Sequence, residues 1–143
     1  MKEYLDKFID LEKQVSQRKG DFFLFALFLR EDAQDKWDLV VAAPWIEKNQ
    51  QKAINYLAAQ LQQKFSAEEL IKISRIVVID QANPALKAIT RAIKVEHGDV
   101  EVQNSNFFGL QISQAYILTA RMPDETSLLR HEAGGISPAV QTL

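Results

Sequence analysis

Residues 22–29 read Phe-Phe-Leu-Phe-Ala-Leu-Phe-Leu, and every one of them is apolar. An uninterrupted, aromatic-rich run of this kind is typical of a strand that is covered on both faces, so it predicts a central strand of a sheet. After the charged stretch 31–36, residues 37–43 read Trp-Asp-Leu-Val-Val-Ala-Ala and predict a second strand, which Pro44 ends. The short charged connection favours an antiparallel pair.

The segments around this pair predict helices that pack on the sheet and strands that extend it. Helical spacing or capping residues predict four helices: 4–15, 54–65, a short one after Ser66 and one that begins at Asn83-Pro84. A β-branched run predicts a strand at 75–79, and alternating residues predict a hairpin over 100–121 with its turn at 104–106. The order is α-β-β-α-β-α-β-β, with the short helix before the third strand.

This order predicts an α/β fold, with α+β as the alternative. Residues 1–121 are expected to form one domain, a mixed five-stranded sheet packed with about three to four helices, since 143 residues suffice for one core but not for two. Residues 122–143 contain two prolines and two glycines without periodicity, and predict a poorly ordered C-terminal tail.

The composition excludes several classes of protein. The chain has no cysteine, which removes disulfide frameworks, cysteine nucleophiles and thiolate metal sites and fits a reducing cytoplasm. Its longest apolar run is far shorter than a membrane helix, and 17 basic against 19 acidic residues give no general attraction to nucleic acid. We therefore expect a cytoplasmic protein that binds no membrane and for which a nucleic-acid partner is disfavoured.

A candidate ligand pocket follows from the strands at 37–43 and 75–79. If these strands are parallel, their carboxyl ends open on the same edge of the sheet, where open α/β sheets bind ligands. The candidate pocket residues at that edge are Trp45, Glu47, Lys48, Asp80 and Asn83. The alternative is structural, and it is the favoured one: Asp80 and Asn83 would cap the following helix, and Trp45 would cover the edge of the core.

An acidic group gives a weaker alternative. Residues 24–30, followed by Asp38-Leu-Val-Val41, resemble over fewer than 20 residues the opening of small nucleotidyltransferases. That resemblance implies Mg²⁺-dependent nucleotidyl transfer, with Asp38 and either Asp35 or Asp80 as metal ligands. The chain departs from the family pattern, because Ala26-Leu27 replaces its Gly-Ser and two residues instead of one separate the acidic pair. Residues three apart on a regular strand also point to opposite faces.

The hairpin supplies a candidate interface. Its last strand offers an unpaired edge if it lies outermost, and Phe107, Phe108 and Tyr116 could form an apolar patch between two copies. The alternative for Phe107 and Phe108 is core packing at the hairpin bend.

No motif names a reaction. The two histidines, His97 and His131, are interpreted as surface residues, and the five glycines form no phosphate-binding loop. The sequence therefore favours a non-catalytic binding or protein-interaction domain without a cofactor, which forms a homodimer or binds another protein. A metal-dependent enzyme that acts on nucleotides or nucleic acid is the alternative.

Overall fold

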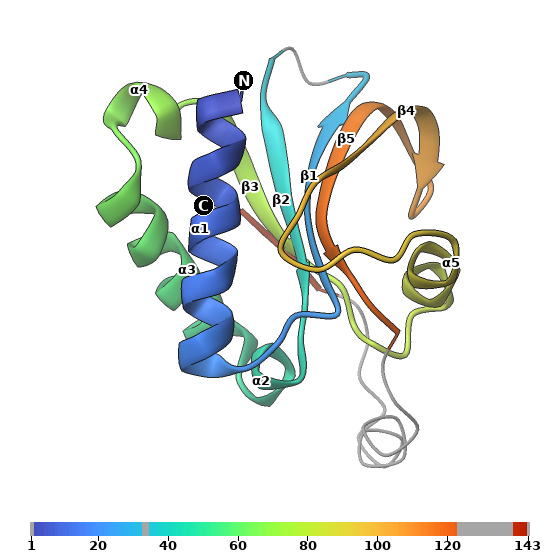
Figure 1. Ribbon diagram of the computed structural model, residues 1–143, viewed down its shortest axis with the longest axis horizontal. Coiled ribbons are helices and arrows are strands. Elements are labelled where there is room, and N and C mark those ends of the chain that lie inside the picture. Colours follow the sequence, from blue (N-terminus) through green and yellow to red (C-terminus); the bar gives the residue numbers. More distant parts are fainter. Residues whose placement is uncertain (1, 33–34, 123–138, 143) are drawn as a thin grey trace.

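The chain forms a mixed β-sheet with helices on both faces, as the predicted α/β class requires (Figure 1). The computed structural model describes residues 2–32, 35–122 and 139–142. None of the helices in those ranges is long and apolar enough to cross a bilayer.

The sheet has the strand order β4-β5-β1-β2-β3-β6. The bounds of its strands are β1 Leu24–Arg30, β2 Trp37–Ala42, β3 Ile73–Val78, β4 Val100–Phe107, β5 Leu110–Ala120 and β6 Ala139–Thr142. The apolar run that begins at Phe22 forms β1, which lies between β5 and β2 and is central as predicted. Strands β2 and β3 are parallel, with Val40 opposite Val77. The carboxyl ends of these two strands therefore lie at the same edge.

The hairpin differs from its prediction in two ways. Residues 104–106 belong to β4, and the chain turns instead at Phe108 and Gly109, whose φ angles are 55° and 77°. Positive φ at both central residues is the geometry of a tight hairpin turn, which is normally built from Asn and Gly. The last predicted strand, β5, is not an edge strand, because it lies between β4 and β1. Among the described strands, β4 is the outermost at this side of the sheet.

The C-terminal segment also differs from its prediction. Residues 139–142, for which no regular structure is predicted, form β6 and pair with β3 antiparallel. Residues 123–138 and 143 of the predicted tail, with His131, lie outside the described residues.

Five helices are described, and they cover the two faces of the sheet unequally. Their bounds are α1 Lys2–Lys19, α2 Pro44–Lys48, α3 Gln50–Lys64, α4 Ala67–Leu70 and α5 Pro84–Ala92. Helices α1 and α3 lie on one face, and α5 lies on the other (Figure 1). The short α2 is not predicted from the sequence. Pro44 ends β2 and also occupies the first turn of α2, where the missing N–H of proline costs nothing.

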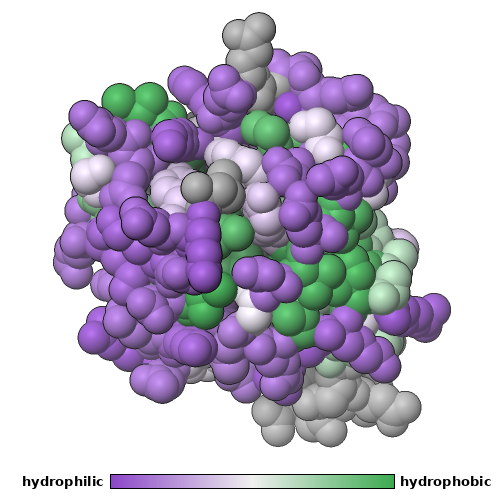
Figure 2. Space-filling model, turned by 45° about the horizontal axis from the view of Figure 1, so that its top comes forward, coloured by the Kyte–Doolittle hydropathy of each residue, from purple (hydrophilic) through white to green (hydrophobic). Residues whose placement is uncertain are grey.

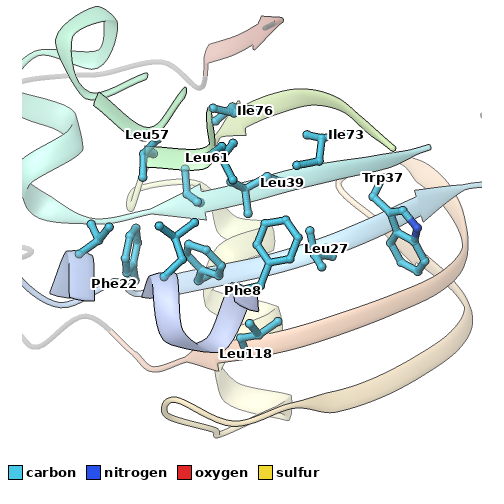
Figure 3. Close-up of a cluster of buried hydrophobic side chains, with 14 of the residues drawn as sticks. Phe8, Phe22, Leu27, Trp37, Leu39, Leu57, Leu61, Ile73, Ile76 and Leu118 are labelled. Carbon is cyan, nitrogen blue, oxygen red and sulfur yellow. The ribbon is translucent and has the colours of Figure 1, made fainter. Parts of the chain in front are cut away.

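Two hydrophobic clusters hold the layers together. The larger one joins α1, α3 and the sheet, and Figure 3 shows Phe8, Leu39 and Leu61 converging in it. Phe8 is fully buried, and its ring centroid lies 4.6 Å from that of Phe65. The smaller cluster joins α5 to the opposite face. Both faces of β1 are thereby covered, which explains why its sequence is apolar throughout.

Candidate functional site

The parallel pair brings together the turns that follow β2 and β3. The backbone N–H of Ile79 donates to the carbonyl of Val41 at 2.9 Å, which keeps the ends of the two strands in register. Beyond that point, Glu47 of α2 reaches the turn after β3, where its Oε1 accepts a hydrogen bond from the backbone N–H of Gln81 at 3.1 Å. Two segments more than 30 residues apart thus meet at one edge, as their parallel direction predicts.

Glu47 and Asp80 form a pair of interacting carboxyl groups at this edge. Asp80 is 2% exposed, and its Oδ1 accepts from the backbone N–H of Ala82 at 2.7 Å. Burial raises the pKa of Glu47 from its ordinary 4.5 to about 7, and the nearby charge and hydrogen bond of Asp80 add to the rise. The hydrogen bond from the backbone N–H of Gln81 acts in the opposite direction and lowers the pKa of Glu47. A carboxyl group with this pKa exchanges its proton near neutral pH, so the pair can donate or accept a proton.

Asn83 has the structural role that the alternative interpretation assigns to it. Its Oδ1 accepts a hydrogen bond from the backbone N–H of Ala85 at 2.9 Å and thereby caps α5. Asp80 makes a similar local bond, to Ala82. Both residues stabilise the turn, and Asp80 alone of the two also faces Glu47.

Trp45 and Lys48 belong to a neighbouring hollow. It has a volume of about 360 Å³ and lies between the end of α1, the helix α2 and the first half of α3. We call it the lysine hollow, and its lining residues are Lys19, Trp45, Lys48, Asn49, Lys52, Ala53 and Tyr56. The five predicted pocket residues are therefore divided between the carboxyl pair, the cap of α5 and this hollow.

Asp38 is held in an ion-pair cluster. It is 1% exposed on the face of the sheet that α5 covers, and its Oδ2 lies 3.0 Å from Nε of Arg30 and 3.1 Å from Nη2 of Arg75. Asp35 is exposed in the β1–β2 turn, with φ 54°. Two guanidinium groups on one carboxylate oxygen compete with any cation, so Asp38 is a poor metal ligand. In the part of the chain that the structure describes, no three acidic or histidine side chains group as a metal site.

A contact between the exposed His97 and the buried Glu12 is absent from the sequence prediction. Glu12 is 0% exposed on α1, and its Oε1 lies 2.8 Å from the hydroxyl of Ser16 and 2.9 Å from Nδ1 of His97. His97 is exposed, as predicted, but its ring is held by a buried acid. One signal was available, because Glu12 and Ser16 fall on the same apolar stripe as Phe8.

The predicted interface residues lie on opposite faces of the sheet. Phe107 and Phe108 stack on Phe28, at centroid distances of 5.1 and 6.3 Å, on the α5 side. Tyr116 packs against Trp37 at 5.5 Å on the α1 side. Tyr116 therefore cannot share one surface with the two phenylalanines.

A shallow apolar groove of about 190 Å³ runs between the hairpin tip and α5. We call it the Phe108 groove, and it is lined by Ala85, Ala88, Ile89, Ala92, Ile93, Asn106, Phe107 and Phe108. Figure 2 shows hydrophobic residues gathered toward the right of the molecule. In Figure 1, the hairpin and α5 lie on that side.

The raised pKa of Glu47 predicts a pH dependence of stability. Between pH 4.5 and about 7 the folded chain holds a proton on Glu47 that the unfolded chain has lost, so its contribution to the free energy of unfolding falls as pH rises. We expect a fall of about 1–2 kcal/mol, less than the full pKa difference implies, because the carboxyl group is only half-buried and solvent screens it.

Chemical denaturation at several pH values, compared with the Glu47→Gln variant, measures this effect. Other groups cancel in the difference between the two proteins. As the pH rises from 4.5 to 7, the free energy of unfolding of the variant should increase relative to that of the wild type. A difference in free energy between the two proteins that stays constant over this range would contradict the prediction.

The described residues thus hold three arrangements with chemical character: the Glu47–Asp80 carboxyl pair, the lysine hollow and the Phe108 groove. No protein-family model, curated protein or solved structure matches the chain.

Proposed function

We propose that this protein is a non-catalytic interaction domain that forms a homodimer through the hairpin tip and the Phe108 groove. The observation that carries the proposal is the conformation of Phe108. Its φ of 55° lies in the left-handed region, which a bulky aromatic residue rarely adopts and which costs about 1–2 kcal/mol relative to glycine. Asparagine or glycine would form the same turn without this cost.

The strained position sets the Phe108 ring against the groove. One side of the ring lies on Phe28, and the residue as a whole stays half-buried. Across the groove, Ala85, Ala88 and Ala92 are too small to fill the space. Leu110 is exposed at the same tip. An apolar surface of this kind gains free energy when a second molecule covers it.

The edge of β4 adds to this surface. Among the described strands, β4 pairs only with β5, so its outer N–H and C=O groups face away from the sheet. The strand runs for eight residues with one charged side chain, Glu101, and without proline. Charges and prolines are what usually protect an edge from pairing with another chain. A two-fold axis beside β4 would place the same tip and edge of both copies together.

Light scattering tests the proposal directly. We expect a mass near twice the 16.3 kDa of one chain, and a shift to the monomer in Phe108→Asn. This variant removes the ring and its contact with Phe28, but it creates an Asn-Gly turn that suits the backbone and relieves the cost of the left-handed φ. Circular dichroism verifies that the variant is folded, so that loss of association is not attributed to unfolding.

Ile71→Asn is the matched control. Ile71 is 68% exposed at the end of α4, away from the hairpin, so its replacement should leave the mass unchanged. A wild-type chain that stays monomeric at high concentration, or a Phe108→Asn variant that still dimerises, would refute the proposed interface.

We also propose that the protein is cytoplasmic, because a chain without cysteine fits a reducing compartment.

A further inference from the structure

The lysine hollow carries an inference that is independent of self-association. Its walls come from three elements: Lys19 ends α1, Trp45 and Lys48 belong to α2, and Lys52 and Tyr56 lie in the first two turns of α3. Its volume of about 360 Å³ falls in the range of small-molecule sites.

Positive charge is concentrated in this hollow. Lys19, Lys48 and Lys52 line it together, while the chain as a whole has a net charge of −2. Within the described ranges, none of the three forms an ion pair with an acidic side chain. Lys19 instead lies over the ring of Tyr56, 4.7 Å from its centroid. Three ammonium groups without a counter-charge repel one another, and an anion bound between them would remove that repulsion.

Two aromatic side chains in the hollow have polar atoms that are buried without a partner. Among the described residues, neither Nε1 of Trp45 nor the hydroxyl of Tyr56 makes a hydrogen bond. The two rings are perpendicular, with centroids 6.1 Å apart. Buried donors of this type normally have an acceptor, so each of these two requires one. A polar group of a ligand that enters beside the rings would supply it.

We propose that the lysine hollow binds a phosphorylated small molecule with a planar ring, of the size of a nucleoside monophosphate. The lysines provide charge-assisted hydrogen bonds to the phosphate oxygens. Trp45 and Tyr56 provide apolar ring surface for the planar part and donors for its polar atoms. The phosphate would occupy the part of the hollow lined by the lysines, and the planar ring the part lined by Trp45 and Tyr56.

Trp45 can report binding. The chain has two tryptophans, and Trp37→Phe leaves Trp45 as the single tryptophan. Adenosine 5′-monophosphate, titrated into this variant, should change the fluorescence with saturation, and inorganic phosphate should compete. Adenosine, which lacks the phosphate, should bind at least about tenfold more weakly, as expected when charge-assisted hydrogen bonds are lost.

Lysine variants locate the site. Lys48→Gln and Lys52→Gln should each weaken binding of adenosine 5′-monophosphate about tenfold. Lys13→Gln removes the same charge from an exposed position on α1 outside the hollow, and should bind as the parent does. All three positions are exposed, and circular dichroism verifies that the variants are folded.

Three results would overturn the proposal. One is no saturable change with adenosine 5′-monophosphate or phosphate in either fluorescence or calorimetry. The second is adenosine binding as tightly as the monophosphate, which would leave no role for the lysines. The third is equal binding by the Lys13, Lys48 and Lys52 variants, which would place the ligand elsewhere.

Discussion

Replacement of His97 by alanine is expected to lower the free energy of unfolding by about 2–3 kcal/mol, because it leaves a buried carboxyl group with too few partners. Glu12 is 0% exposed, and its described partners are the hydroxyl of Ser16 and Nδ1 of His97. Without the imidazole, the hydroxyl alone remains. The side chain of His97 is 40% exposed, so water entering the vacated space keeps the loss below that of a fully buried pair.

The backbone of His97 requires a second variant. Its φ is 51°, which alanine tolerates less well than asparagine, so His97→Ala includes a conformational cost. His97→Asn largely removes that cost and should still lose at least about 1 kcal/mol through the weaker contact with Glu12.

A double-mutant cycle isolates the contact itself. In the background of Glu12→Gln, which carries no charge, His97→Ala should cost much less than in the wild type. Urea denaturation of the four proteins measures the coupling. Costs that simply add would mean that Glu12 and His97 do not interact in solution.

The parallel pair at the centre of the sheet is predictable from sequence, and so is the meeting of Glu47 and Asp80. Buried strands with a helix between them form parallel neighbours, and the turns after such strands share an edge. What the pattern could not assign is the direction of each side chain beyond that edge. Trp45 and Lys48 turn toward α3 because Pro44 begins a short helix, and a helix of five residues leaves too little periodicity to be seen in the sequence.

The remaining errors have a different cause. Local turn rules place the hairpin bend at Asn104 to Asn106. The bend instead lies at Phe108 and Gly109, where Phe107 and Phe108 pack on Phe28. This packing holds Phe108 at a positive φ, which a bulky aromatic residue disfavours. The contact between Glu12 and His97 joins residues 85 apart in the chain. Such a contact depends on how α1 crosses the sheet, which no local pattern records.

Replacement of Asp38 by alanine is expected to cost about 3 kcal/mol of unfolding free energy, the other large effect that the structure predicts. Asp38 lies between Arg30 and Arg75 and is nearly inaccessible to solvent. Its removal leaves Arg75 without its described carboxylate partner and Arg30 with the exposed Asp32 alone. Asp38→Asn keeps an acceptor oxygen but not the charge, and should cost about half as much.

The same variant distinguishes two roles of Asp38, as the partner of two arginines or as a metal ligand. If Asp38 held Mg²⁺, the cation would stabilise the wild type and would not stabilise Asp38→Ala, because a ligand that binds only the folded state raises its stability. The two guanidinium groups predict the reverse, namely the same small response to millimolar Mg²⁺ in both proteins. The triple replacement of Asp38 by leucine and of Arg30 and Arg75 by methionine should recover most of the stability, since apolar side chains of similar volume can replace a buried ion-pair cluster. Thermal unfolding with and without Mg²⁺ decides the question, and a rise confined to the wild type would restore the metal-dependent alternative.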